Sequence, residues 1–144
     1  ATRGEIVTFL WRAHGAPRAS AHPAFSDVNG DAYYADAVAW AVEEGITTGV
    51  GTTGRFEPHR PATRAEVVTF LWRAHGSPTS WFNPFFDIPT GIWYEPATTW
   101  AGRSGISTGV GGGAVFHPDT RISRAEVVTF LWRAHGTPIG PAAI

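Results

Sequence analysis

The sequence predicts an all-helical protein built from repeated units of helix, glycine-rich loop and helix. One stretch of fourteen residues occurs three times with few changes: TRGEIVTFLWRAHG from Thr2, TRAEVVTFLWRAHG from Thr63 and SRAEVVTFLWRAHG from Ser123. These stretches begin 61 and 60 residues apart, and the segments between them also resemble each other at the same period. Such a period is typical of stacked supersecondary units that bury their apolar faces against their neighbours.

Two full units and part of a third account for the 144 residues, which we treat as one domain. The full units span residues 25–78 and 85–138, and residues 1–17 hold only the last helix of a partial unit. The connectors RASAHP and TSWFNP contain proline and small residues and are expected to be short linkers. Because the chain has no initiator methionine and opens on a repeat, we expect a mature form or a fragment.

The repeated stretch is predicted to be the longer helix of each unit, because both of its ends are marked. Thr63 is a favoured N-cap, and Glu66 three residues later completes a capping box. His75 falls in the last turn, where the helix dipole favours a cation, and Gly76 suits the left-handed position just after the helix. An apolar stripe at helical spacing joins these ends: Val67, Phe70, Leu71 and Ala74.

A shorter helix is predicted in the front half of each unit. In YYADAVAWAVEEG an apolar face recurs at helical spacing and Gly45 ends the helix. In WYEPATTWAGRSG the position of Pro96 sets the start near Glu95. This second copy has poorer helix formers, namely Thr98, Thr99 and Gly102.

Between the two helices the chain reads GITTGVGTTGRFEP and GISTGVGGGAVFHP. So many glycines indicate an ordered series of turns with positive φ angles. We expect Phe56 and Phe116 to anchor these loops on the helices.

Composition narrows the possible functions. The chain has 11 basic and 12 acidic residues, so it lacks the basic excess of a general nucleic-acid or anionic-membrane binder. No apolar run is long enough to span a bilayer. There is no cysteine, hence no disulfide and no thiolate metal site, and we predict no cofactor. We also expect no enzymatic activity, because no nucleophile, base and orienting group occur in a familiar order.

The first-turn arginines Arg3, Arg64 and Arg124 are the strongest candidates for a functional role. A cation at a helix N-terminus is disfavoured by the dipole, so its presence in all three copies suggests a specific purpose. One hypothesis is an anion-binding site and the other is a structural ion pair, for example of Arg64 with Asp27, Asp87 or Glu66.

Repeated aromatic and histidine residues also leave alternatives open. The tryptophans at positions 11, 72 and 132 could pack as core or serve as sugar platforms, and core packing is favoured. Trp81 and Trp93 are not repeated and flank loops, which makes them better carbohydrate candidates. His14, His75 and His135 could form a three-histidine zinc site on a threefold axis, but capping of the helix dipole is the favoured interpretation, and no metal is predicted.

The order of these motifs resembles the S-layer homology repeat. The residues that carry the resemblance are an F-x-D pattern at 25–27 and 85–87, glycines at 45–49 and 105–109, F-x-P at 56–58 and 116–118, and the helix starts at 63–66 and 123–126. The resemblance implies that three repeats form a pseudo-threefold bundle, the three-prong spindle. It also implies an extracellular location at the cell wall or cell surface.

The resemblance further implies non-covalent anchoring to an acidic cell-wall polysaccharide, often a pyruvylated one, in grooves between neighbouring repeats. The arginines would face the acidic sugar there, helped by an aspartate, by loop backbone and by aromatic side chains. Carried over, the expected ligand-binding set is Arg3, Arg64, Arg124, Asp27, Asp87, Gly49, Gly109, Trp81 and Trp93. The alternative is a protein-interaction module that self-associates through its incomplete repeat.

Overall fold

The computed structural model describes residues 1–111 and 113–135, and there it consists of five helices without a sheet. The longer helices are α1 (Arg3–Ala13), α3 (Arg64–Ala74) and α5 (Arg124–His135). The shorter ones are α2 (Ala35–Glu43) and α4 (Glu95–Arg103). The predicted all-helical class, and both helices of each full unit, are confirmed. None of the helices in this part of the chain combines the length and apolar character that crossing a membrane demands.

The long helices begin and end where their sequence signals predict. The Thr63 hydroxyl accepts a hydrogen bond from the Glu66 amide at 3.2 Å, and the Glu66 carboxylate accepts one from the Thr63 amide at 3.1 Å. The other two long helices start with equivalent bonds. Gly76 follows α3 with φ of +84°, the left-handed conformation expected of it. The predicted end of the later unit at Pro138 lies outside the described residues.

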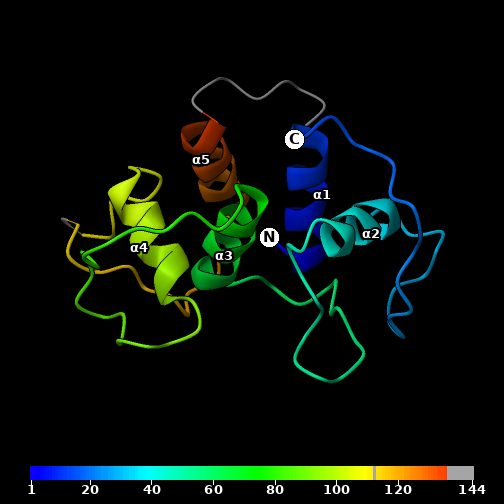
Figure 1. The fold of residues 1–144 in the computed structure, drawn as a ribbon, viewed down its shortest axis with the longest axis horizontal. Helices are drawn as coiled ribbons and strands as arrows, with labels where there is room; N and C mark the ends of the chain where they lie inside the picture. Colours follow the sequence, from blue (N-terminus) through cyan, green and yellow to red (C-terminus); the bar gives the residue numbers. More distant parts are fainter. Residues whose placement is uncertain (112, 136–144) are drawn as a thin grey trace.

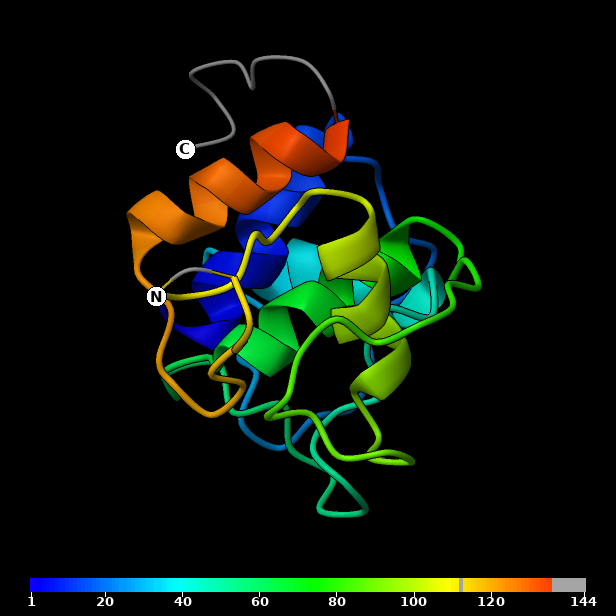
Figure 2. The same ribbon diagram turned by 90° about the vertical axis from the view of Figure 1, so that its left-hand side faces the viewer.

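The three long helices contact one another pairwise and form the centre of the structure (Figure 1). α2 packs on α1 and α4 packs on α3, so each short helix covers the long helix of the preceding unit. Within the described residues α5 contacts only α1 and α3, and no short helix covers it. Figure 2 shows α5 at the edge of the bundle, beside α1.

The segments that precede the long helices form a closed ring of backbone hydrogen bonds. The Ala62 amide donates to the Ala1 carbonyl at 2.9 Å, and the Ile122 amide donates to the Ala62 carbonyl at 3.1 Å. The Ala1 nitrogen closes the ring by donating to the Ile122 carbonyl at 2.7 Å. The three long helices therefore start side by side at one end of the bundle. The three-prong spindle implied by the resemblance remains a prediction.

Aromatic side chains of the loops and short helices fill the space around the long helices. Phe56 and Phe116 are fully buried, which confirms that they anchor the glycine-rich loops. Burial of a phenylalanine side chain contributes about 1.5–3 kcal/mol. Trp40 of α2 and Trp100 of α4 are almost fully buried at equivalent positions. The remaining buried residues of α2 are those of its predicted apolar face and their neighbours: Ala35, Ala37, Val38, Ala39 and Ala41.

The weak helix formers of α4 are explained by its packing. Thr98 and Thr99 are both buried against the bundle, where side-chain contacts compensate for their low helix propensity. At Gly102 a Cβ atom would lie 2.7 Å from Pro84 and 2.8 Å from Phe85. Glycine is favoured here because a Cβ atom would force the rings of Pro84 and Phe85 to shift.

Candidate functional site: two grooves between the long helices

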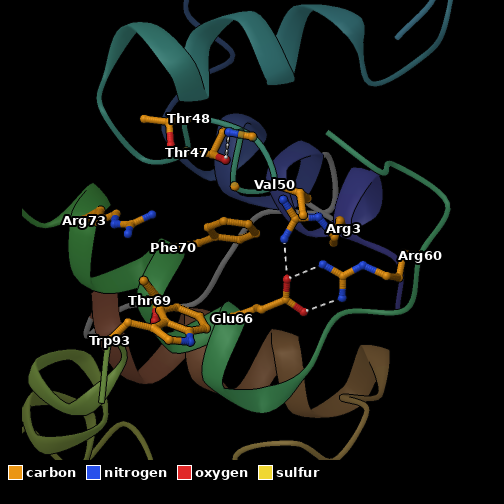
Figure 3. A pocket seen from close by; sticks show the side chains of 12 residues that line it. Arg3, Thr47, Thr48, Val50, Arg60, Glu66, Thr69, Phe70, Arg73 and Trp93 are labelled. Atoms are coloured by element: carbon orange, nitrogen blue, oxygen red, sulfur yellow. Dashed lines mark hydrogen bonds and ion pairs between the residues drawn. The ribbon is translucent and has the colours of Figure 1, made fainter. Parts of the chain in front are cut away.

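A first groove of about 360 Å³ lies where the start of α1, the first glycine-rich loop and α3 meet (Figure 3). It takes residues from three successive units, because Trp93 of the later unit forms part of its wall. The full lining is Arg3, Thr47, Thr48, Gly49, Val50, Gly51, Arg60, Glu66, Thr69, Phe70, Arg73 and Trp93.

A second groove of about 250 Å³ repeats this arrangement between α3, the second glycine-rich loop and α5. All of its members except Ala125 occupy the repeat positions of residues in the first groove, with Arg64 in place of Arg3 and Gly109 in place of Gly49. The full lining is Arg64, Ser107, Thr108, Gly109, Ala125, Glu126, Thr129, Phe130 and Arg133. The two grooves are thus equivalent sites built by the repeat.

The first-turn arginines form ion pairs that link one long helix to the next. Arg3 of α1 pairs with Glu66 of α3, and Arg64 of α3 pairs with Glu126 of α5. Arg124 of α5 pairs with a carboxylate of α1, Glu5, at 2.9 Å. In each case the acceptor is the capping-box glutamate of the neighbouring helix. The structural ion-pair hypothesis therefore describes these arginines, with partners in the neighbouring unit.

These partners differ from the ones that the sequence suggested. Arg64 pairs with neither Asp27, Asp87 nor Glu66, because its side chain leaves α3 on the side facing α5. Asp27 instead accepts hydrogen bonds from the Phe56 and Glu57 amides at 2.9 and 2.8 Å. Burial acts to raise the pKa of Asp27, but these two bonds outweigh it and lower the pKa.

Asp87 repeats that arrangement in the later unit, with bonds of 2.8 Å from the Phe116 and His117 amides. Glu57 and His117 each have φ of +59°, an unusual conformation for residues with a side chain. The aspartates therefore hold the chain at a strained turn and lie outside the lining of both grooves.

The first arginine is deeply enclosed. Its Nε atom donates to the Phe56 carbonyl at 2.9 Å, and its guanidinium lies over the Phe56 and Phe70 rings at 4.8 and 5.3 Å from their centroids. The Arg3 side chain is only 4% exposed, and that of Arg64 only 6%, whereas Arg124 is 56% exposed. Burial lowers the pKa of Arg3 from its ordinary value, although arginine stays charged at any physiological pH.

Glu66 lies between two arginines at one end of the first groove (Figure 3). Arg60 donates to its two carboxylate oxygens at 3.1 and 2.9 Å, opposite the bond from Arg3. Burial acts to raise the pKa of Glu66, but the bonds from Arg60 and Thr63 and the charge of Arg3 outweigh it, so the pKa is lowered. The later unit has Thr120 in place of Arg60, so the second groove lacks this extra cation.

Arg73 and Arg133 are groove residues that the sequence analysis missed. Arg73 lines the first groove and donates to the Ile46 carbonyl at 3.0 Å, and Arg133 lines the second and donates to the Ile106 carbonyl at 3.0 Å. Burial lowers the pKa of Arg73, with no opposing contribution from an acid. Among the described residues neither arginine forms an ion pair with a carboxylate.

Helical geometry explains why Arg64 and Arg73, both on α3, line different grooves. Residues nine positions apart lie about half a turn round a helix, so Arg64 and Arg73 leave α3 on opposite sides. Glu66, Phe70 and Arg73 are spaced four and three residues apart and share the face that lines the first groove. The dipeptide WR recurs in all three copies, and this repetition is the feature of the sequence from which Arg73 could have been identified.

The tryptophans outside α2 and α4 differ in their exposure. Trp93 is 60% exposed and lines the first groove, while Trp81 is 73% exposed and lies outside both linings. Trp11 and Trp72 are partly buried, and their indole nitrogens donate to the Pro17 and Pro78 carbonyls at 2.8 Å. Trp11 and Trp72 therefore hold the chain that follows each long helix and pack at the margin of the core. The third copy, at position 132, is half exposed.

The three repeated histidines lie together at the opposite end of the bundle from the first-turn arginines. His14 and His75 are the C-cap residues of α1 and α3, and their Nδ1 atoms lie 2.8 Å from the carbonyls of Leu10 and Leu71. They thus lie at the helix ends that the sequence indicated and contact carbonyls of the last turn. In the described part of the chain no three histidine or acidic side chains are arranged to hold a metal ion.

Comparison with known proteins matches this architecture to one family. The S-layer homology domain family matches residues 24–68. A cell surface protein of Thermoanaerobacter kivui is 36% identical over 118 residues, covering 78% of this chain and 15% of the relative. An S-layer protein of Bacillus thuringiensis subsp. finitimus is 32% identical over 121 residues, and the S-layer protein sap of Bacillus anthracis is 31% identical over 121 residues. Each of these two matches covers 83% of this chain and 14% of the relative.

The chain thus spans about one seventh of the length of these relatives. The matched segment 24–68 contains the F-x-D pattern, α2, the first glycine-rich loop and the capped start of α3, and the later unit repeats all four. Motif order, helical fold and relatives agree, and we conclude that the chain carries S-layer homology repeats.

Proposed function

We propose that this chain anchors a larger cell-surface protein to an acidic polysaccharide of the cell envelope, using its two grooves as non-covalent binding sites. A cell-surface location follows from the S-layer homology repeats and from the relatives, which are named as S-layer and cell surface proteins. Names of this kind describe structural proteins, in keeping with binding rather than catalysis. The charged side chains that line the grooves support an acidic polysaccharide as the ligand.

The observation that carries the proposal is an arginine without a carboxylate partner in the lining of each groove. Arg3 and Arg64 are each compensated by a glutamate, but Arg73 and Arg133 have no carboxylate partner among the described residues. Arg73 is partly buried, which makes its uncompensated guanidinium costly, and an anionic ligand would relieve that cost, whereas Arg133 is exposed. A planar guanidinium can bind a carboxylate through two hydrogen bonds.

The balance of charge in the grooves favours an acidic ligand. The first groove has three arginines and one glutamate in its lining, and the second has two arginines and one glutamate. Both grooves therefore keep a positive excess after their internal ion pairs are counted. A carboxylate-bearing sugar, such as one with a pyruvyl group, has the charge and geometry to occupy this position.

The first groove is better equipped for a sugar ring than the second. The exposed indole of Trp93 forms part of its wall, and the apolar face of a pyranose packs well on such a ring. Gly49 lines this groove without a side chain, and glycine is favoured there because a Cβ would lie 2.7 Å from Phe25 and 2.9 Å from the Arg55 carbonyl. No aromatic residue other than Phe130 lines the second groove. We therefore expect the first groove to bind more tightly.

Co-sedimentation with cell walls of the source bacterium tests the proposal. The double variant Arg73→Gln/Arg133→Gln should bind walls about 10- to 100-fold more weakly, because a hydrogen bond to a charged group contributes about 1.5–3 kcal/mol. Arg12→Gln is the matched control, since Arg12 has the same repeat position on α1 and lies outside both grooves. Walls stripped of acidic polymers should bind neither form. Equal binding by the double variant and the control would contradict the proposal.

A second candidate function is self-association through α5. Val7 and Val68 are fully buried under α2 and α4, whereas their repeat equivalent Val128 is only partly buried, and Trp132 is half exposed. This face of α5 has the residues that elsewhere receive a short helix. A second copy, or another unit of S-layer homology sequence, could supply one.

Analytical ultracentrifugation distinguishes this candidate from glycan binding. Self-association predicts a dimer that dissociates on dilution and that Val128→Asp abolishes, because burying an unpaired carboxylate is unfavourable. Val110→Asp, a change at an exposed loop valine, should leave the dimer intact. A wild-type protein that stays monomeric at all concentrations would exclude this function.

A further inference from the structure

The C-terminal ends of the three long helices bring their histidines into one cluster, defined here as His14, His75 and His135. The ring centroids of His14 and His135 are 5.2 Å apart, those of His75 and His135 are 5.4 Å apart, and those of His14 and His75 are 6.5 Å apart. Three imidazoles thus meet where three helices converge. The helix starts, with their arginine–glutamate pairs, lie at the other end.

The hydrogen bonds of the cluster fit neutral imidazoles. His14 and His75 have Nδ1 atoms 2.8 Å from the carbonyls of Leu10 and Leu71. A carbonyl only accepts, so each of these Nδ1 atoms donates its N–H, and Nε2 is the atom that would take up a proton if the ring became charged. The Nε2 atom of His135 is buried and has no hydrogen-bond partner within the described residues. Protonation of that atom would bury an N–H group without an acceptor.

Within residues 1–111 and 113–135, no acidic group compensates for a positive charge on His135. Burial lowers the pKa of His135, and the charges of His14 and His75 lower it further, with no carboxylate acting in the opposite direction. α2 and α4 contribute the uncharged rings of Trp40 and Trp100, which lie 5.2 and 5.4 Å from His14 and His75.

The charged residues near these helix ends either form hydrogen bonds with groups outside the histidine cluster or are exposed to solvent. Of the arginines in the last turns of the long helices, two bind the carbonyls of Ile46 and Ile106, and the one on α1 is exposed. At the end of α2 one glutamate binds Ser20 and its neighbour is exposed, and at the end of α4 the arginine is exposed. These residues are Arg12, Arg73, Arg133, Glu43, Glu44 and Arg103.

We propose that the histidine cluster is a proton-sensitive clamp, which holds the ends of α1, α3 and α5 together when neutral and forces them apart when protonated. Neutral rings pack edge to face, whereas two or three imidazolium ions at these separations repel one another. The clamp concerns the cohesion of the bundle and does not depend on glycan binding.

The direction of the pH effect follows from linkage. The folded state disfavours protonation of His135, so the unfolded chain binds more protons as the pH falls below the ordinary histidine pKa of about 6.5. The stability that the neutral cluster contributes is therefore complete above that pH and is lost as the pH falls through the lower folded-state value. Carboxylates titrate near pH 4 and contribute little between about pH 7.5 and 5.5.

Thermal unfolding between about pH 7.5 and 5.5 tests the clamp. The melting temperature of the wild type should fall across this range, and the fall should shrink by about half or more in His135→Gln and in His75→Gln, which do not titrate. His22→Gln, a change at an exposed histidine outside the cluster, should keep the wild-type fall. An unchanged fall in both cluster variants, or no fall in the wild type, would overturn the proposal.

Two further measurements keep the test decisive if the variants fold poorly. In an NMR titration of the wild type, at least one cluster imidazole should titrate below about pH 6.5, and ordinary titration of all three would refute the clamp. Addition of Zn²⁺ at about pH 7.5 should leave the wild-type melting temperature unchanged. Stabilisation by Zn²⁺ that His135→Gln removes would overturn the proposal by making the cluster a metal site.

Discussion

At the scale of single residues, the repeated first-turn arginine acts as a connector between units. Arg3 is held by the Phe56 carbonyl, two phenylalanine rings and Glu66, and Arg64 repeats that environment with Glu126. This explains why the arginine recurs although the helix dipole disfavours it: the neighbouring unit, rather than its own helix, supplies the compensation. The sequence showed that the arginine mattered but could not show its partner, which lies about sixty residues away.

The buried pair yields a prediction with a matched control. Glu66→Gln should destabilise the protein by about 3–5 kcal/mol, because Arg3 would be left buried without an opposite charge and facing Arg60. Glu5→Gln removes the equivalent charge from the pair with the exposed Arg124 and should cost below about 1 kcal/mol.

Glutamine can still complete a capping box, so both variants keep the helix start and differ in the burial of the ion pair. Urea denaturation of Glu66→Gln, Glu5→Gln and the wild type measures the free energy of unfolding of each, from which the two losses are compared. Similar losses in both would mean that burial of the Arg3 pair adds nothing to stability.

At the scale of elements, capping boxes, apolar stripes and terminal glycines predicted both long and short helices, because these signals are local. Packing between elements was not local and was harder to predict. The short helix covers the long helix of the preceding unit, and the sequence alone does not show which long helix receives it. The same holds for Arg73, whose groove is defined by a loop from the preceding half of its unit.

The close approach of α4 to its connector gives a prediction at this scale. Gly102→Ala should destabilise the protein by about 1–3 kcal/mol, although alanine favours a helix, because its Cβ would overlap Pro84 and Phe85. Pro84→Ala should recover part of this loss in a double variant.

Gly30→Ala is the control for this prediction, since a Cβ there meets no atom within 4 Å and the change should stay within about 0.5 kcal/mol. Denaturation curves of Gly102→Ala, of the double variant and of Gly30→Ala give the free energies of unfolding to be compared with the wild type. A stabilising effect of Gly102→Ala would show that the connector moves away freely.

At the scale of the whole molecule, the grooves and the histidine cluster share the same long helices. The first groove follows α3 from Glu66 in its first turn to Arg73 in its last, while the histidines meet at the C-terminal ends of the helices. The sequence predicted the helical repeats and grooves between them through the family resemblance. It offered ion pairs as one hypothesis for the first-turn arginines but did not identify their partners, because those depend on how the units meet. The convergence of the histidines follows from the same geometry.

The most direct measurement is an equilibrium titration of the protein with soluble acidic polysaccharide released from the cell wall. The account predicts that Arg73→Gln weakens binding by about tenfold or more, that Arg133→Gln weakens it less because Trp93 serves only the first groove, and that Arg12→Gln has no effect. Equal affinities for all three variants and the wild type would contradict the claim that the grooves bind the polymer through these arginines.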